Sequence, residues 1–356
     1  MKHIFNKKRI SSILSILPSS IVKYEDELSD YNFPEMQSKR LGMMMDYHTR
    51  RECNNDDGLS DYALYGIEYL IKKNIFKKDD IDAIIVVSSS QDYIMPSVSY
   101  ILQGKLGLSQ DTYCCDIINA CGGYINGLMQ SFMAIDTFGL HKVLLVTGDM
   151  LTKKTGKHDR NSRPIIGDAV NVSIIEHYEE GDNIYVDCQN FGEKSNAIKI
   201  PAGGMKLPSS SITAVEEKDE SGNYRSLDHF YMDGDAVFNF VMTQVPPMIL
   251  DVLKYSGDKL DAIDYYIFHQ PNKYMVDRLA DEIEIPSEKI FANIVGIYGN
   301  SSTGTIPLNI CHNIASHVTT RNLRLCLSGF GAGLTCNALV INNPKMDFCD
   351  IIEYKI

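Results

Sequence analysis

The fold is decided by the stretch Asp116–Ser131, which reads DIINACGGYINGLMQS. A short apolar strand runs into Cys121, two glycines follow, and the apolar residues after them recur at helical spacing. Cys121 is therefore predicted at a strand-to-helix turn, where the glycines permit close approach of another backbone or a ligand. A helix N-terminus beside the sulfur favours the thiolate, the nucleophilic form of cysteine. The pattern predicts a nucleophile, and the alternative is a buried structural cysteine.

The composition is typical of a globular protein that binds neither nucleic acid nor a membrane. The chain has 356 residues, of which 44% are hydrophobic and 22% charged, enough for one large domain or two ordinary ones. A net charge of −12 argues against nucleic-acid and anionic-membrane surfaces. The apolar stretch Ile13–Leu17 is too short for a signal peptide. No run approaches about 18 apolar residues, so no transmembrane helix is expected.

The nine cysteines are scattered along the chain, and the adjacent Cys114 and Cys115 form no C-x-x-C pair. An odd number of scattered cysteines indicates reduced thiols in a cytoplasm, without a disulfide framework. No metal site is expected from their spacing. The chain contains no tryptophan.

Strand-like and helix-like segments alternate along the chain. Helical spacing over Asp61–Lys73 precedes a buried strand at Ile81–Val87, and Val143–Thr147 is another apolar strand. In the second half, strands are expected at Tyr265–Phe268 and Leu323–Leu327. This alternation predicts an α/β architecture with covered sheets, and a repeated strand-then-glycine pattern suggests two similar halves.

Between these halves the sequence is polar and then strongly helical. Residues 179–223 are rich in Gly, Ser and Lys and predict a long loop around Gly203–Ser211. Ala236–Tyr255 predicts a long helix, which Pro246 and Pro247 are expected to kink or to restart.

Two further segments carry polar groups suited to catalysis. Phe268–Asn272 reads FHQPN and puts His269 at the carboxyl end of a strand, where sites of α/β proteins lie. Tyr298–Thr305 reads YGNSSTGT and forms a turn before a helix. Taken alone, a histidine in this place is structural more often than catalytic, and the turn is just a loop. The glycine run Gly329–Gly333 lacks the Lys-Ser/Thr ending of a phosphate loop, which excludes that function.

In this order, over nearly the whole chain, these segments resemble those of thiolase-like condensing enzymes, most closely β-ketoacyl-acyl-carrier-protein synthase III. NACGG resembles the nucleophile segment of the family, FHQPN its His-Gln-x-Asn segment, and YGNSS its Gly-Asn-Thr/Ser-Ser segment. GFGAGLT resembles its terminal glycine loop. Further matches lie at residues 91–97, 167–169 and 232–240.

The resemblance implies a thiolase-like fold of five layers, α-β-α-β-α, made of two similar halves. Residues 1–178 would form the half that carries Cys121, and residues 179–356 the half that carries His269 and Asn300. The resemblance also implies a homodimer.

The same resemblance implies an acyltransferase of fatty-acid biosynthesis type with a Cys-His-Asn triad. Cys121 would accept an acyl group, with the backbone N–H groups of Cys121 and Ala332 as the oxyanion hole. His269 and Asn300 would donate hydrogen bonds to the carbonyl of a malonyl-type thioester, whose enolate attacks the acyl-cysteine and gives a 3-oxoacyl thioester. Coenzyme A or phosphopantetheine thioesters would be substrates, and no further cofactor is implied.

The substrate-binding positions depart from the family pattern. Where the family carries a Trp that stacks on the adenine of coenzyme A, this chain has MMMDYHTRRE at Met43–Glu52. Tyr274 replaces the arginine that docks the carrier protein, and Met95 stands where an often aromatic acyl-pocket residue reaches across the dimer. The substrate-binding residues that the resemblance implies are Met95, Arg50, Arg51, Arg160 and Asn272.

These departures predict a specialised member, in a lipid or secondary-metabolite pathway, rather than the housekeeping fatty-acid initiator. An acyl carrier protein is the expected partner. Because the carrier is acidic, it would need a local basic patch on this acidic chain. The candidates for that patch are Lys199, Lys206, Lys273 and Arg278.

Three other functions were weighed against condensation. Acyl transfer from Cys121 to a hydroxyl or amine would use the same triad, so the sequence leaves that alternative open. A papain-like protease needs its cysteine near the mature N-terminus beside an aromatic residue, which this chain lacks. A non-catalytic subunit of the superfamily typically loses the cysteine that is present here.

Overall fold

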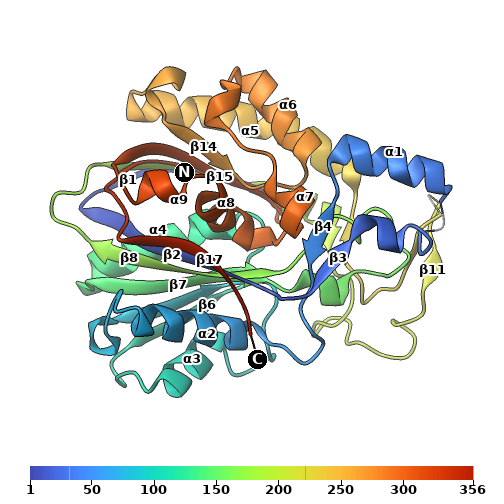
Figure 1. Ribbon diagram of the computed structural model, residues 1–356, viewed down its shortest axis with the longest axis horizontal. Coiled ribbons are helices and arrows are strands. Elements are labelled where there is room, and N and C mark those ends of the chain that lie inside the picture. The colour runs from blue at the N-terminus through green and yellow to red at the C-terminus, as the bar shows by residue number, and fades with distance from the viewer. Residues whose placement is uncertain (32, 221, 356) are drawn as a thin grey trace.

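The computed structural model describes residues 1–31, 33–220 and 222–355. Asn32, Ser221 and Ile356, which belong to the two predicted halves, lie outside the described residues. The described chain forms two stacked β-sheets with helices between them and on both outer faces (Figure 1).

The first sheet has six strands in the order β17-β2-β8-β7-β5-β6. β5 pairs in parallel with both β6 and β7, whereas β8 pairs antiparallel with β7 and β2. Both faces are covered, and in keeping with this β5 (AIIVV) is a continuous apolar run and β7 (KVLLVTGD) is apolar at its centre. The strands are β2 (Lys8–Leu17), β5 (Ala83–Val87), β6 (Tyr113–Ile117), β7 (Lys142–Asp149), β8 (Ala169–His177) and β17 (Phe348–Glu353).

The second sheet has five strands in the order β1-β9-β16-β15-β14. β14 is parallel to β15, and the other neighbours pair antiparallel. The predicted boundary after residue 178 falls between β8 and β9, but β1 and β17 cross it, each joining the sheet of the opposite half. The strands are β1 (Lys2–Phe5), β9 (Ile184–Asn190), β14 (Tyr265–Phe268), β15 (Leu323–Gly331) and β16 (Thr335–Asn343).

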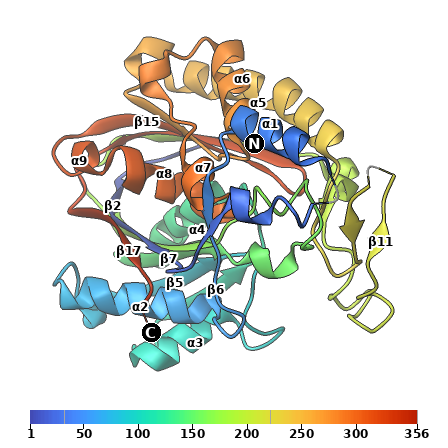
Figure 2. The ribbon, with the colours of Figure 1, turned by 45° about the vertical axis from the view of Figure 1, so that its right-hand side comes forward.

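The helices complete the predicted layer order α-β-α-β-α, which Figure 2 shows from top to bottom. α4 (Gly123–Phe138) and α8 (Thr305–Asn313) contact both sheets and form the middle layer. α2 (Leu59–Lys72) and α3 (Val98–Leu106) cover the outer face of the six-stranded sheet. α5 (Gly234–Ser256) packs on the five-stranded sheet, and α6 (Lys273–Ile283) packs on α5.

Shorter elements connect these layers. The helices are α1 (Glu35–Met45), α7 (Ile294–Tyr298) and α9 (Ala315–Val318). The short strands pair as β3 (Ile21–Lys23) with β4 (Thr49–Arg51), β10 (Ile198–Lys199) with β13 (Tyr231–Met232), and β11 (Glu217–Lys218) with β12 (Tyr224–Arg225).

α5 confirms the predicted long helix and corrects one of the two effects expected from its prolines. Pro246 and Pro247 do not start a new helix, because α5 runs unbroken from Gly234 to Ser256. Its buried face, which includes Val245, Pro246 and Met248, packs on the sheet, and this packing outweighs the lost hydrogen bonds of the prolines. By length and composition α5 alone, within the described residues, could cross a membrane, but half of it is buried against the sheet and α6.

Candidate active site

Cys121 lies in the tight turn between the end of β6 and the start of α4. The glycine-rich end of β15 packs directly on this turn. A Cβ added to Gly329 would come 3.0 Å from the Cα of Gly122, and one added to Gly331 would come 2.6 Å from the Cβ of Cys121. Gly331 also has φ +148°, which favours glycine. The close backbone approach predicted for this turn is therefore present, and it comes from the C-terminal half.

His269 follows the last residue of β14 and is buried. Its backbone N–H donates to the Ser328 carbonyl at 2.7 Å, and its ring packs edge-on against Phe330. The ring atom Nδ1 lies 2.7 Å from the Thr305 hydroxyl oxygen at the start of α8. Burial lowers the pKa of His269 to about 3, so the imidazole is neutral at physiological pH.

Asn300 is held by backbone and side-chain hydrogen bonds. Its N–H donates to the Ile165 carbonyl at 2.7 Å, and its carbonyl accepts from the Gly167 N–H at 3.2 Å. Its side-chain Oδ1 accepts from the Ser302 N–H at 2.9 Å. With the amide oxygen engaged, the amide Nδ2 is the group that remains to donate.

One cavity is lined by Cys121, His269, Asn300 and Ala332 together. Its volume is about 70 Å³. Most of the remaining wall is apolar and comes from both halves of the chain: Leu151, Ile165, Ile166, Ile198, Phe230, Met232, Val237, Val241, Met275 and Phe330. Within the described ranges, no group of three His, Cys, Asp or Glu side chains could hold a metal ion.

The sulfur of Cys121 sits in an environment that favours the thiol. Burial first, and the nearby Asp149 carboxylate to a lesser extent, raise its pKa to about 11. Hydrogen bonds from Ser302 and from the backbone N–H groups of Ala332 and Cys121 act in the opposite direction. The N–H groups beside the sulfur thus favour the thiolate, but in the resting site the loss of water around the sulfur outweighs those donors.

The chain was compared with known proteins. Residues 115–191 match the profile of 3-oxoacyl-[acyl-carrier-protein] synthase III, and residues 253–343 match the profile of its C-terminal part. A Campylobacter jejuni protein named for 3-oxoacyl-[acyl-carrier-protein] synthase 3 is 30% identical over 355 residues, 99% of both chains. The chain belongs to the 3-oxoacyl-[acyl-carrier-protein] synthase III family.

Solved structures support the same conclusion. A 3-oxoacyl-(acyl-carrier protein) synthase from Burkholderia xenovorans shares 26% identity, covers 99% of both chains and superposes with a TM-score of 0.92. The priming β-ketosynthase of the R1128 polyketide pathway, at 19% identity, matches 96% of this chain and 98% of its own and has the same fold, with a TM-score of 0.79. The predicted family and thiolase-like fold are thus confirmed, and the protein is an acyl-transferring condensing enzyme.

Among the substrate-binding residues implied by resemblance to the synthase III family, Arg50 and Arg51 do not line the cavity. Arg50 is buried and pairs with Glu27 and, at 2.9 Å, with Glu52. Arg51 pairs with Glu353 at 2.8 Å and donates to a backbone carbonyl. Both guanidinium groups are therefore engaged in ion pairs within the fold rather than facing the cavity.

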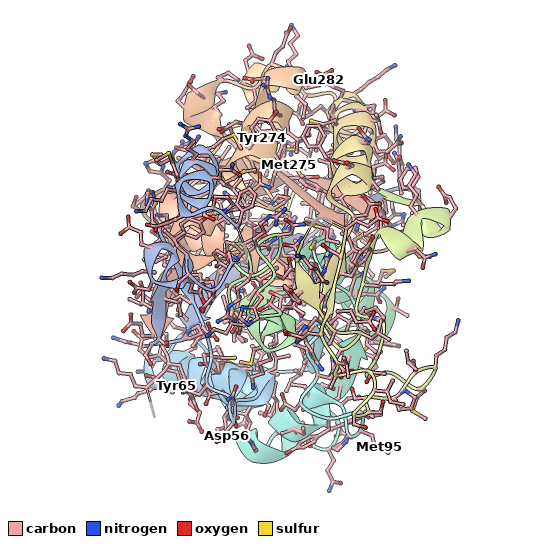
Figure 3. The ribbon with its side chains drawn as sticks, turned by 90° about the vertical axis from the view of Figure 1, so that its right-hand side faces the viewer. Asp56, Tyr65, Met95, Tyr274, Met275 and Glu282 are labelled. Atoms are coloured by element: carbon pink, nitrogen blue, oxygen red, sulfur yellow. The ribbon has the colours of Figure 1, made fainter. Side chains whose placement is uncertain are left out.

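Asn272 does line the cavity, but its side chain also caps α6 by accepting from the Met275 N–H at 2.8 Å. Met95 is 79% exposed and is absent from the cavity wall of its own chain. Figure 3 shows Met95 at the opposite end of the molecule from Met275, which lines the cavity.

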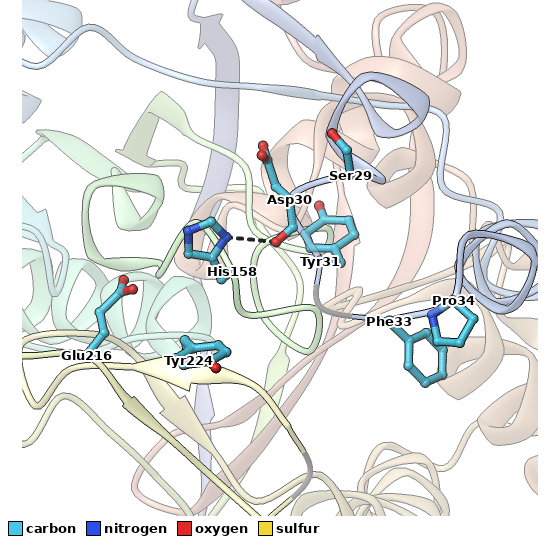
Figure 4. Close-up of a pocket in the computed structure, with 8 residues that line it drawn as sticks. All are labelled: Ser29, Asp30, Tyr31, Phe33, Pro34, His158, Glu216 and Tyr224. Atoms are coloured by element: carbon cyan, nitrogen blue, oxygen red, sulfur yellow. Dashed lines mark hydrogen bonds between the residues drawn. The ribbon is translucent and has the colours of Figure 1, made fainter.

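Arg160 lies outside the cavity, with its guanidinium 4.3 Å from the ring centroid of Phe33. Phe33 lines an open surface pocket of about 800 Å³ (Figure 4). His158 and Asp30 border the same pocket, and His158 Nδ1 lies 2.7 Å from the Asp30 carbonyl.

The basic residues predicted to dock a carrier are partly paired. Lys273 binds Asp277 on α6 at 2.6 Å, and Lys199 donates to Asn196 at 3.0 Å. Arg278 lies over the Tyr274 ring and near Asp281, and Lys206 is exposed in the long loop. Tyr274 is itself stacked on Phe238, with ring centroids 6.1 Å apart.

Three polar residues of the site escaped the sequence analysis: Ser302, Thr305 and Asp149. The Ser302 hydroxyl lies 3.7 Å from the Cys121 sulfur, and Thr305 contacts the His269 ring. Asp149, at the end of β7, is 0% exposed. The only signals for these residues were a Gly/Ser/Thr turn and a strand that ends in Gly-Asp, which are too common to single them out.

The raised pKa of Cys121 predicts how its alkylation depends on pH. The rate of reaction with iodoacetamide should rise about tenfold per pH unit from pH 7 to 9, because only the thiolate reacts and its fraction rises with pH below the pKa. Peptide mass spectrometry of Cys121 measures the rate, and Cys121→Ser serves as the control without a label at that peptide. A plateau below pH 8 would instead show a thiolate stabilised in the resting site.

Proposed function

We propose that this protein is a decarboxylative condensing enzyme that carries its acyl group on Cys121. The strongest support is that one mainly apolar cavity is lined by Cys121, His269 and Asn300. The His269 imidazole is uncharged there. Its substrates are acyl and malonyl-type thioesters of coenzyme A or of a carrier-protein phosphopantetheine, and its product is a 3-oxoacyl thioester.

In the first half-reaction the Cys121 sulfur attacks the carbonyl carbon of the acyl thioester. The bond from that carbon to the donor sulfur breaks, the donor leaves as a thiol with the proton that Cys121 gave up, and the acyl group stays on Cys121. The N–H groups of Ala332 and Cys121 already interact with the sulfur. They are suited to donate to the carbonyl oxygen as negative charge develops on it.

In the second half-reaction the malonyl-type thioester loses CO2, and the electron pair of the broken C–C bond moves into an enolate. The enolate oxygen needs preorganised donors in a dry site. His269 Nε2 and Asn300 Nδ2 supply two donors without a buried positive charge, since the pKa of His269 is about 3. The enolate carbon then attacks the acyl carbonyl, and Cys121 leaves as a thiolate that takes up a proton from solvent water, because its first proton left with the donor thiol.

The alternative is transfer of the acyl group from Cys121 to a hydroxyl or amine. That acceptor has to give up a proton as it attacks, and the efficient general base for this has a pKa near the working pH. His269, with a pKa of about 3, is a weak base at neutral pH. Decarboxylation forms its nucleophile without a base, so the site favours condensation.

We further propose that the enzyme is a homodimer joined through the edge of the six-stranded sheet. β6 is the last strand of that sheet and leaves its outer backbone edge unpaired within the described chain. Around it lie exposed apolar side chains, which favour an interface. They are Tyr93, Ile94, Met95, Tyr100, Tyr113, Ile118 and Phe138.

The pathway and partner are also proposals. The absence of tryptophan and the presence of Tyr274 in place of the docking arginine support a specialised pathway with a carrier-bound substrate. Free thiols at all nine cysteines suit a reducing cytoplasm. On α6 three acidic residues outnumber two basic ones, so the exposed Lys206 is the strongest remaining candidate for contact with an acidic carrier.

Variants of the polar pair test the division of roles. His269→Ala and Asn300→Ala should each slow decarboxylation on the order of 10²–10³-fold, because one enolate donor is lost, while Cys121 still becomes acylated. Intact mass measures acylation, and CO2 release measures decarboxylation. His312→Asn, at a half-buried histidine outside the cavity, is the matched control. If both cavity variants lost acylation but kept decarboxylation, the roles would be reversed.

Subunit mixing tests whether Met95 reaches the cavity of a partner. Met95→Phe should shift preference toward short acyl chains, because a rigid ring replaces a flexible side chain. The Met95→Phe variant is then mixed with Cys121→Ser chains. In a mixed dimer the intact Cys121 belongs to the Met95→Phe chain, and the Met95 that reaches its cavity comes from the Cys121→Ser chain. The original chain-length profile should therefore return. Activity over an acyl series measures the profile. An unchanged profile in the Met95→Phe homodimer would remove Met95 from the pocket.

Donor choice tests the carrier proposal. For one acyl group, kcat/KM should be higher on carrier protein than on coenzyme A, and the carrier value should fall as salt rises, because screening weakens contacts between charges. Lys206→Glu should lower only the carrier value, whereas Lys72→Glu on the far outer layer should change neither. Equal values on both donors without salt dependence would show that coenzyme A is held directly, and the Phe33 pocket would be the first place to test.

A further inference from the structure

The His269 ring shares its one side-chain hydrogen bond within the described residues with Thr305, the first residue of α8. The distance from Nδ1 to the Thr305 Oγ1 is 2.7 Å, and both residues are buried. A neutral imidazole carries one proton, on either Nδ1 or Nε2. The partner of Nδ1 therefore decides which nitrogen is left to face the cavity as a donor.

The Thr305 hydroxyl can donate its hydrogen bond to either of two acceptors. One is Nδ1 of His269, and the other is the Ser302 carbonyl oxygen at 3.3 Å. The backbone N–H of Gln270 points at the same hydroxyl oxygen from 3.4 Å and occupies part of its capacity to accept. If the Thr305 hydroxyl donates to Nδ1, the imidazole carries its own proton on Nε2. If the hydroxyl donates to the Ser302 carbonyl, the imidazole proton is on Nδ1 and Nε2 has none.

The distances favour the first arrangement. The contact of 2.7 Å between Thr305 Oγ1 and Nδ1 is that of a close hydrogen bond, so Nδ1 is the nearer acceptor for the hydroxyl proton. The contact of 3.3 Å to Ser302 is the weaker of the two sites for the proton.

We propose that Thr305 is a positioning residue that fixes the tautomer of His269, keeping the ring proton on Nε2. This inference rests on the proposed function in one respect, since it is the decarboxylation step that uses the Nε2 proton as a donor. The ring stays neutral throughout, so the hydroxyl controls where the proton sits and not whether the ring is charged. Without that hydroxyl, Nδ1 would keep the proton and donate it toward the Ser302 carbonyl, and the enolate would lose a donor.

A pair of variants separates this role from simple packing. Thr305→Val keeps the shape and removes the hydroxyl, whereas Thr305→Ser keeps the hydroxyl and removes a methyl group. In full-length protein with ¹⁵N-labelled histidine, the ring nitrogen shifts identify the tautomer, and His269→Ala assigns the signals. The natural chain and Thr305→Ser should show the Nε2 proton. Thr305→Val should shift to the Nδ1 proton, slow decarboxylation on the order of 10²-fold and leave Cys121 acylation unchanged.

Each other outcome has a distinct meaning. An Nδ1 proton in the natural chain, or an unchanged tautomer in Thr305→Val with an unchanged melting temperature, overturns the inference. A tautomer shift without slower decarboxylation keeps Thr305 as the residue that fixes the tautomer. That result would instead refute the proposed use of His269 as an enolate donor, so the two failures are distinguishable. Equal slowing in both variants would indicate lost packing and overturn the inference.

Discussion

Ser302 contacts Cys121, His269 and Asn300. Its N–H donates to Asn300 Oδ1 at 2.9 Å, its hydroxyl lies 3.7 Å from the Cys121 sulfur, and its carbonyl is a hydrogen-bond acceptor for the His269 ring when that ring is protonated. These contacts require a left-handed backbone, with φ at +55°. For a residue other than glycine this conformation costs on the order of 1 kcal/mol and persists only when its surroundings enforce it. Ser302 is 2% exposed, and the packing around it provides that enforcement.

The surroundings of Ser302 are fixed in turn by a buried carboxylate. Asp149 accepts from the Thr303 N–H and hydroxyl on one oxygen, and from the three serines 88–90 on the other. Burial raises the pKa of Asp149, and these donors oppose that change. A buried carboxylate needs hydrogen-bond donors of this kind. Removing those donors would leave the buried charge unpaired and strongly destabilise the folded protein. The network ties the ends of β5 and β7 to the Asn300 loop and thereby joins the two halves where the triad meets.

The sequence allowed prediction of the elements whose signal is local and, through the order of its segments, of the three residues that share the cavity: Cys121, His269 and Asn300. β7, β14 and α2 follow directly from apolar periodicity. The surroundings of Arg50 and Arg51 could not be foreseen, because their ion-pair partners Glu27 and Glu353 are distant in sequence. Ser302 lies 181 residues from Cys121, so no local pattern reveals their contact. In α5 the stabilisation from packing on the sheet likewise exceeds the cost of the two prolines, so the helix is continuous where local sequence favours a break.

The same burial acts in opposite directions on the two titrating groups of the triad. It raises the pKa of Cys121 to about 11 and lowers that of His269 to about 3. Both shifts remove charge, so at neutral pH the resting triad is uncharged. The first charge to form in the cavity is then one created by the reaction, on the sulfur or on a carbonyl oxygen. In a dry, mainly apolar cavity such a charge interacts with fixed donors far more strongly than it would in water. The placement of N–H donors around Cys121 and beside Asn300 therefore matters more for the rate than the resting reactivity of the thiol.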